Sequence, residues 1–283
     1  MLDSEAREII RQMMEEDRIS EDVTSKSLIP EEARARGEII AGQPGVLAGV
    51  QEALTVFEEL GVEAEPVKSD GDRVEAGAVL VEVEGPARGI LAAERVALNL
   101  LSRMSGVATA TRNMQEGAKK ANPEVRIAAT RKTVPLLRDF DKKAVELVGG
   151  EPHRYHLGDF VLIKDNHLKL VDSVPEALKR AREAGLSDQI EIEVSSREEA
   201  LSAAENGADI VMLDNFGVEE AGETLEALKS AGLRDEVVIE ASGGIDPSNV
   251  AEYAALGVDV ISSSYMTMRA PAFDVKLEIS EEL

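Results

Sequence analysis

The chain contains no cysteine and no tryptophan among its 283 residues. Without cysteine, disulfide bonds, thiolate catalysis and cysteine-ligated metal sites are excluded. Aromatic residues make up only 3% of the chain, so the core must be mostly aliphatic. The same scarcity makes nucleic-acid binding by stacking of bases on aromatic side chains unexpected.

Positive charge is also scarce. The chain has 31 Lys and Arg against 55 Asp and Glu, a net charge of −24, which does not suit a nucleic-acid partner. No apolar run approaches the roughly 18–20 residues that a membrane span needs. The opening MLDSEAREIIRQMMEED lacks the basic and then apolar pattern of a signal peptide. We therefore expect a cytoplasmic protein with no membrane association.

The stretch from residue 126 to 169 reverses this charge balance. It holds nine basic and six acidic residues, so it carries +3 while the rest of the chain carries −27. The basic residues are Arg126, Arg131, Lys132, Arg138, Lys142, Lys143, Arg154, Lys164 and Lys169, and all three histidines, His153, His156 and His167, lie here too. This concentration predicts a pocket for a polyanion. The alternative is a solvated basic helix face.

The first part of the chain predicts a small α+β domain. Apolar residues at positions 9, 10, 13 and 14 indicate an amphipathic helix that begins at Asp3 or Ser4. Residues 36–89 contain short β-like runs broken by glycine, with a helix-like segment, QEALTVFEEL, at 51–60. The pair Asp70-Gly71 is typical of a turn. We place this domain at residues 1–105.

The second part alternates apolar β-rich runs with helical segments. After a long helical stretch from residue 91, the runs are RIAATRK (126–132), FVLIKDNH (160–167), IEIEV (190–194), ADIVMLDN (208–215), VVIEASGG (237–244) and VDVISSS (258–264). Such alternation indicates either an α/β barrel or a doubly wound parallel sheet. We place this domain at 106–271, and expect the strand-like segment within 272–283 to return to the first domain.

Each run is apolar at its start and polar at its carboxyl end. In a barrel these ends share one rim, where barrel enzymes place their sites. The polar ends include Arg131, Lys132, Lys164, Glu193, Asp214, Ser242-Gly243-Gly244 and Ser262-Ser263-Ser264. Their convergence favours an active site on this rim.

The cations on the rim are suited to binding anions. Arg131 offers bidentate hydrogen bonds to a carboxylate or phosphate, and Lys132 offers a point charge beside it. His153-Arg154 and Lys164 add to them, although a surface salt bridge is the alternative for each. Across the rim, Glu193 and Asp214 could bind Mg²⁺ or sugar hydroxyls. Glu191 shares a strand face with Glu193, and we interpret it as a deeper barrel residue paired with a lysine.

Two loops near the carboxyl end of the barrel are typical of phosphate sites. Ser242-Gly243-Gly244 follows the fifth run and Ser262-Ser263-Ser264 the sixth. Barrels often bind phosphate through backbone N–H groups of the corresponding loops. This pair therefore predicts a phosphate subsite.

Seven blocks of the sequence, in order, closely resemble quinolinate phosphoribosyltransferase, also called carboxylating nicotinate-nucleotide pyrophosphorylase. The blocks are ERVALNLLSRMSGVAT (94–109), TRKT (130–133), GGEPHRYHLGDFVLIKDNH (149–167), EIEV (191–194), MLDN (212–215), EASGGI (240–245) and GVDVIS (257–262). The resemblance implies an α/β fold class, with a TIM-like open α/β barrel of about seven strands and a smaller α+β N-terminal domain. Six strands are evident from the sequence, so one is unassigned.

The resemblance also implies a reaction: quinolinate and phosphoribosyl pyrophosphate (PRPP) give nicotinate mononucleotide, pyrophosphate and CO₂, with Mg²⁺ required. Quinolinate carries two carboxylates and PRPP several phosphate charges, so a cationic pocket is needed. The implied assembly is a homodimer or homohexamer in which Arg95, on the long helix, reaches the neighbouring site. For Arg95, the alternative is an ion pair with acidic residues of its own helix.

The site residues implied by the resemblance fall into groups. The cationic pocket would comprise Arg95, Arg131, Lys132, His153, Arg154 and Lys164, with Thr130 beside it. Glu193 and Asp214 would hold ribose hydroxyls or Mg²⁺, and Ser242, Gly243, Gly244, Ser263, Ser264 and Tyr265 would hold the 5-phosphate. We assign Lys132, Lys164, Glu193 and Asp214 as the catalytic residues.

The sequence departs from the family pattern in its last loop. Ser264 and Met268 stand where the family usually has glycine and histidine. A serine limits close approach of the backbone to phosphate if that position needs a positive φ. The substitution therefore bears on the 5-phosphate contact.

Three alternatives remain. A related phosphoribosyltransferase that does not decarboxylate, or a molybdenum-associated paralogue, would share much of the pattern, but the intact TRK, HR and KDNH blocks favour the decarboxylating enzyme. An aldolase would use Lys164 to form a Schiff base and would need a depressed lysine pKa. A non-catalytic paralogue would have lost several of the rim charges.

Overall fold

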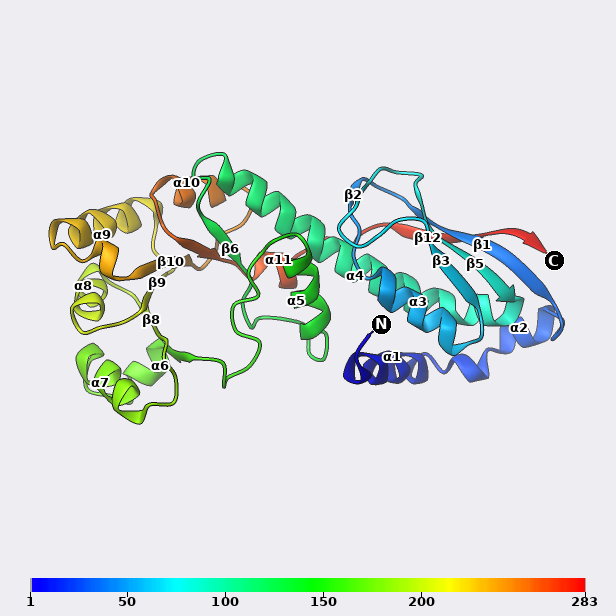
Figure 1. Cartoon of the computed structure of the whole chain (residues 1–283), viewed down its shortest axis with the longest axis horizontal. Coiled ribbons are helices and arrows are strands. Elements are labelled where there is room, and N and C mark those ends of the chain that lie inside the picture. Colours follow the sequence, from blue (N-terminus) through cyan, green and yellow to red (C-terminus); the bar gives the residue numbers. More distant parts are fainter. Residues whose placement is uncertain (1, 283) are drawn as a thin grey trace. The chain divides into compact units, whose positions relative to one another are not determined.

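The computed structural model describes residues 2–282 (Figure 1). The chain divides into two compact units. The first comprises Met1–Ala110, Val134–Gly149 and Ala270–Leu283, and the second comprises Thr111–Thr133 and Gly150–Arg269. No helix among the described residues is long and apolar enough to cross a membrane.

The first unit is built on a four-stranded antiparallel sheet. The strand order is β12-β1-β5-β3, with β1 at Arg34–Ala41, β3 at Glu63–Pro66, β5 at Val79–Pro86 and β12 at Val275–Glu282. Alternate residues of β1 are buried, as expected for a sheet with one face on the core. Strand β12 pairs with β1, with Val275 opposite Ala41, so residues 275–282 lie in the sheet of this unit.

The first two α-helices of this unit begin at a capping aspartate, Asp3 for α1 (Ser4–Glu16) and Asp22 for α2 (Val23–Leu28). In α1, the Asp3 side chain accepts a hydrogen bond from the Ala6 amide at 2.8 Å. Ile10 and Met14 form the buried stripe of this helix. The remaining elements are η1 (Ile19–Glu21), α3 (Val50–Glu59), α5 (Arg138–Leu147) and the two-stranded sheet of β2 (Gly45–Val46) and β4 (Arg73–Val74).

The second unit is built on a six-stranded parallel sheet. Its strand order is β6-β11-β10-β9-β8-β7, with β6 at Arg126–Ala128, β7 at Val161–Ile163, β8 at Ile190–Val194, β9 at Ile210–Asp214, β10 at Val238–Ser242 and β11 at Val260–Ser262. All six strands predicted from the apolar runs are present. An isolated parallel bridge between Ala128 and Glu151 lies beyond β6, in place of a seventh full strand.

Helices connect these strands and lie alongside them (Figure 1). They are α6 (Asp165–Leu168), α7 (Val174–Ala184), α8 (Arg197–Glu205), α9 (Val218–Ser230), η2 (Arg234–Glu236), α10 (Val250–Ala255) and α11 (Tyr265–Met268). Ser173 caps α7 and Ser196 caps α8, each through a side-chain oxygen that accepts a backbone N–H. Parallel strands need such crossovers, which bring every strand's carboxyl end to the same edge of the sheet.

The division differs from the sequence boundaries at one segment. The long helix α4 (Ala87–Lys119) passes from the first unit into the second, but Val134–Gly149 groups with the first unit, whereas the sequence placed it in the barrel. Polar contacts explain this grouping. Asp141 on α5 accepts two hydrogen bonds from Arg103 at 2.8 Å, and Lys143 pairs with Glu52 at 2.7 Å.

Candidate active site

A cavity of about 390 Å³ opens at the carboxyl ends of the parallel strands in the second unit. Its size is within the range of small-molecule sites. It is lined by Ala129, Thr130, Arg131, Lys132, His153, Arg154, Leu162, Lys164, Glu193, Met212, Asp214, Asn215, Glu240, Ser242, Gly243, Gly244 and Ser262. The rim predicted from the polar strand ends therefore brings together most of the predicted substrate-binding residues.

Two arginines form the cationic part of this cavity. Arg154 is only 5% exposed and donates to the Phe160 carbonyl at 3.2 Å. Burial and the neighbouring charge of Arg131 lower the pKa of Arg154, so the guanidiniums repel one another. The Nε atom of Arg131 is buried without a hydrogen-bond partner. A bound carboxylate would relieve both conditions, because it supplies acceptors and opposite charge.

A lysine and two carboxylates form the other part. Lys164 Nζ pairs with Glu193 Oε2 at 2.6 Å. Burial and the negative charge of Glu193 raise the pKa of Asp214, although the Asn215 amide and the ammonium groups of Lys132 and Lys164 oppose the rise. Two neighbouring carboxylates that repel one another are a suitable place for ribose hydroxyls or a hydrated cation.

The loop after β10 packs closely against Asn215, the residue that follows Asp214, at Gly243. Gly243 has φ +93°, and a Cβ there would lie 2.4 Å from Asn215 Oδ1 and 2.7 Å from the Asn215 backbone nitrogen. Asn215 itself has φ +59° and donates to Asp214 Oδ2 at 2.6 Å. The sequence analysis did not identify Asn215, although its place directly after Asp214 at the rim was a usable signal.

We predict that Gly243→Ala disrupts this loop. The substitution adds a methyl group against fixed backbone and forces a non-glycine residue into a left-handed conformation, which costs on the order of 1–3 kcal/mol. A fall in the free energy of unfolding, measured by urea denaturation, should accompany loss of PRPP binding. Gly158→Ala, at a glycine with nothing within 4 Å of an added Cβ, is the matched control. Equal behaviour of the two variants would contradict the prediction.

The last predicted loop contributes less to the cavity than expected. Ser262 lines it and donates to Ser242 Oγ at 2.9 Å, but Ser263, Ser264 and Tyr265 are not among its lining residues. Ser263 Oγ donates to the Ile245 carbonyl at 2.5 Å and accepts the Tyr265 N–H at 3.0 Å. The Ser263 hydroxyl is therefore engaged with the β10 loop and with the Tyr265 amide, and the assignment of Ser263, Ser264 and Tyr265 to the 5-phosphate remains a prediction.

The two departures from the family pattern are accommodated differently. Ser264 has φ −83°, so the position does not require glycine. Met268 is 50% exposed. The intervening Thr267 is buried, and its hydroxyl donates to the Lys132 carbonyl at 2.7 Å. The short helix α11 therefore fixes the backbone of the TRKT loop.

A buried cluster of His153, Glu191 and Glu240 forms part of the cavity wall, through His153 and Glu240. His153 Nε2 lies 3.2 Å from Glu191 Oε2 and 3.3 Å from Glu240 Oε2. The prediction that Glu191 pairs with a lysine was therefore wrong, since its observed partner is an imidazole. Glu240 was missed, although it precedes Ser242 by two residues and so shares its strand face, the rule that identified Glu191.

The remaining basic residues of the 126–169 stretch serve local structure. His167 Nδ1 accepts the Lys164 amide at 2.8 Å and so caps α6. Arg126 pairs with Glu151 at 3.0 Å, and Lys169 pairs with Asp165 at 3.0 Å. Arg138, Lys142 and Lys143 belong to the first unit, and His156 is exposed. The polyanion interpretation applies to the cavity-lining cations and not to the whole stretch.

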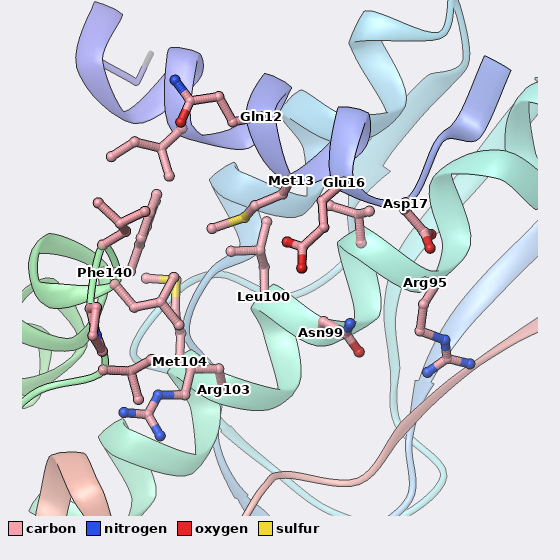
Figure 2. Close-up of a pocket in the computed structure, with 16 residues that line it drawn as sticks. Gln12, Met13, Glu16, Asp17, Arg95, Asn99, Leu100, Arg103, Met104 and Phe140 are labelled. Carbon is pink, nitrogen blue, oxygen red and sulfur yellow. The ribbon is translucent and has the colours of Figure 1, made fainter.

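Arg95 lies in the first unit, in a separate cavity of about 590 Å³. Figure 2 shows α1 and α4 facing each other across it, with Met13 and Leu100 between them and Arg95 toward one end. The Arg95 side chain is 61% exposed and lies 3.7 Å from Glu94, the intrahelical alternative. That contact is long and exposed, so it holds the guanidinium weakly.

Two consecutive parts of the chain match the two domains of a single enzyme family. Residues 22–105 match the quinolinate phosphoribosyl transferase N-terminal domain, and residues 107–278 match its C-terminal domain. The chain belongs to the quinolinate phosphoribosyltransferase family. The expected fold, an α/β barrel-like unit with a smaller N-terminal unit, is confirmed by this match and by the observed sheets.

Individual relatives agree with the family assignment. A probable nicotinate-nucleotide pyrophosphorylase [carboxylating] of Methanothermobacter thermautotrophicus is 44% identical over 96% of this chain and 98% of its own. Its counterpart from Methanocaldococcus jannaschii is 42% identical over 99% of each chain. The crystal structure of nicotinate-nucleotide pyrophosphorylase from Ehrlichia chaffeensis superposes with a TM-score of 0.90 at 32% identity, covering 96% of this chain and 98% of that one.

Proposed function

We propose that this chain is a carboxylating phosphoribosyltransferase of de novo NAD biosynthesis. It converts quinolinate and PRPP to nicotinate mononucleotide, pyrophosphate and CO₂. The observation that carries the proposal is one cavity that places Arg131, Arg154 and Lys132 together with the carboxylates of Glu193 and Asp214. Dianionic quinolinate fits the first group, and the hydroxyl-bearing ribose of PRPP fits the second.

The cations position quinolinate. Arg131 has an unpartnered buried nitrogen, and Arg154 is buried beside it, so the two carboxylates of quinolinate would supply both hydrogen-bond acceptors and opposite charge. Arginine forks fix a carboxylate in a defined plane, which presents the pyridine nitrogen in one direction. Holding both reactants in line removes much of the entropic barrier.

The carboxylates assist the ribose. As the bond from C1 to pyrophosphate lengthens, positive charge develops on the ring oxygen and C1. Glu193 and Asp214 place fixed negative charge in this part of the cavity, while Lys132 and Lys164 offset the growing charge on the leaving group. After the nitrogen–C1 bond forms, the 2-carboxylate leaves as CO₂ and the electron pair of the broken bond stays on C2, where the adjacent positive pyridinium nitrogen stabilises it. C2 then takes up a proton from water.

Glu193 and Asp214 are the residues that fit Mg²⁺. Burial and the charge of Glu193 raise the pKa of Asp214, and a divalent cation would relieve the repulsion between the two carboxylates. Mg²⁺ commonly binds through one or two carboxylates together with substrate phosphates. When bound with PRPP, Mg²⁺ would neutralise charge on the pyrophosphate. The chain's own part is to hold these carboxylates at the end of β8 and β9.

We propose that the active assembly is a homodimer, or a homohexamer of such dimers, in which Arg95 completes the neighbour's site. The exposed guanidinium and its weak contact with Glu94 support this role. Arg95→Ala and Lys132→Ala should each be inactive alone. After mixing, denaturation and joint refolding, half the dimers are mixed and each holds one intact site, so about a quarter of wild-type activity should return. No recovery from correctly assembled mixtures would contradict sharing of the site.

The reaction itself is tested by a product assay. The protein with quinolinate, PRPP and Mg²⁺ should release nicotinate mononucleotide and CO₂ in equal amounts. Nicotinate in place of quinolinate should give no product. Turnover of nicotinate alone would favour the non-decarboxylating alternative, and no turnover of either by the folded protein would reject the proposal.

A further inference from the structure

We propose that Glu191 and Glu240 are positioning residues that orient the His153 imidazole and keep it cationic, so that it binds a carboxylate of quinolinate beside the two arginines. The inference rests on the proposed function, because it concerns the same cavity. It assigns to two buried glutamates a role that they exert through His153.

The position of the two glutamates in the barrel supports this role. Glu191 lies on β8 and Glu240 on β10, with β9 between them in the sheet. Alternate strands of an α/β barrel contribute side chains to the same interior layer. Each glutamate precedes a rim residue by two positions, Glu193 on β8 and Ser242 on β10, so both carboxylates lie one layer beneath the rim. They form a platform beneath the part of the cavity that contains His153.

The carboxylates are deeply buried. Glu191 is 0% exposed and Glu240 is 1% exposed, and the His153 side chain is 12% exposed. Both oxygens of Glu191 and Oε1 of Glu240 make no hydrogen bond. Buried carboxylates without hydrogen bonds are costly unless an opposite charge lies against them. The imidazole lies against both, and its protonated form supplies that charge.

The backbone of His153 indicates that the placement of this ring matters. Its φ is +56°, in the left-handed region that a non-glycine residue adopts at a cost on the order of 1–3 kcal/mol. The ring also lies 5.3 Å from that of Phe160, at 58°. Two carboxylates on one edge of the imidazole and an aromatic ring nearby restrict its orientation despite the strained backbone.

The electrostatics work in the same direction. Burial alone would lower the pKa of His153, but the carboxylates of Glu191 and Glu240 outweigh it and raise the pKa to about 9. Arg131 and Arg154 line the same cavity, and their positive charges favour loss of the proton from His153. Lys132, Lys164, Glu193 and Asp214 are the other charged residues among its lining. Without the two glutamates, a buried histidine beside two arginines would be neutral at physiological pH.

The sign of the pH effect follows. The folded-state pKa lies above the unfolded value of about 6.5, so the imidazolium is present at neutral pH and is lost as pH rises through about 9. Quinolinate binding should weaken over that upper range. A metal ion held by the same three side chains, whose ligand atoms lie within 4.8 Å of one another, is the competing interpretation.

The test compares Glu240→Gln with the wild type across pH 6–9.5. If the His153 pKa falls by one to two units from about 9, the protonated fraction at pH 8.5 drops, and the KM for quinolinate should rise about three- to 25-fold. At pH 6 the ring is protonated in both proteins, so the difference should disappear. The KM for PRPP should change less than threefold at either pH. Glu226→Gln, at a side chain 76% exposed on α9, is the matched control.

A direct titration keeps the test independent of turnover. NMR of ring-labelled histidine should show one imidazole with a pKa near 9 in the wild type, absent in His153→Gln and shifted down in Glu240→Gln. A wild-type His153 that titrates near 6.5, or a KM defect equally large at pH 6 and 8.5, would overturn the proposal. So would a stoichiometric metal in the purified protein that Glu240→Gln loses. The high pKa in a protein that does not use quinolinate would instead reject the proposed function alone.

Discussion

Replacing Arg154 with methionine should raise the KM for quinolinate by about 10- to 150-fold. Methionine keeps much of the apolar length of the side chain and removes the guanidinium, and a hydrogen bond to a charged group contributes roughly 1.5–3 kcal/mol. The guanidinium is 5% exposed, so solvent screens its interaction with a bound carboxylate weakly. The KM for PRPP should change far less. Steady-state kinetics with each substrate varied in turn measures the difference.

Stability distinguishes this prediction from general damage to the fold. Arg154 donates to the Phe160 carbonyl, but burial and the charge of Arg131 act against it in the free protein. Loss of the hydrogen bond to Phe160 destabilises the folded protein, and removal of the repulsion from Arg131 stabilises it. The free energy of unfolding should therefore change by less than about 1 kcal/mol. Arg197→Met, at a half-exposed arginine on α8, should leave both KM values unchanged. Wild-type kinetics for Arg154→Met would show that the quinolinate pocket lies elsewhere.

The sequence predicted the strands of the second unit and most of its rim because an apolar run and the polar residues at its end indicate the same strand. A run such as ADIVMLDN is apolar until its last residues, so it indicates both a buried strand and the place where that strand reaches the cavity. Asp214 is the last residue of β9, as the pattern requires. Parallel pairing then brings the ends of separate runs together, whatever the loops between them do.

The sequence could not predict partners that depend on three-dimensional layers. Glu191 was predicted to lie deeper in the barrel than Glu193. Its partner, however, depends on which residue of a distant loop places its side chain against both Glu191 on β8 and Glu240 on β10. His153 supplies that residue, and no local pattern indicates it. The grouping of Val134–Gly149 with the first unit is another case. It depends on ion pairs of Asp141 and Lys143 with residues distant in the sequence.

The loop after β11 is another place where local sequence did not identify the individual side chains that line the cavity. Ser263, Ser264 and Tyr265 were assigned to the 5-phosphate because the resemblance implies that the polar segment after the last strand holds it. In the structure Ser262 lines the cavity and these three residues do not, while Ser263 donates to the Ile245 carbonyl of the β10 loop and accepts the Tyr265 N–H. Side chains of consecutive residues point in different directions, so a polar run at a strand end marks the region of a site more reliably than its individual ligands.

Asp214→Asn should reduce kcat/KM for PRPP by about 10²–10³-fold, the effect typical of removing one preorganised electrostatic group from an active site. The substitution keeps the size of the side chain and removes the charge that would bind ribose hydroxyls or Mg²⁺. Activity should require a higher Mg²⁺ concentration, whereas quinolinate binding, measured by calorimetry without PRPP, should stay within about threefold of wild type. Asp235→Asn, at an exposed residue of η2, is the matched control.

The free protein should tolerate this change or gain stability from it. Burial and the charge of Glu193 raise the pKa of Asp214, so the ionised carboxyl is unfavourable in the folded state at neutral pH. A group with a raised carboxyl pKa opposes folding above its unfolded value near 3.9, and the neutral amide removes that opposition. Unchanged or increased resistance to urea together with lost PRPP use would identify Asp214 as a group kept for function at the expense of stability. Equal loss of quinolinate and PRPP binding would instead place it outside the ribose and Mg²⁺ side of the cavity.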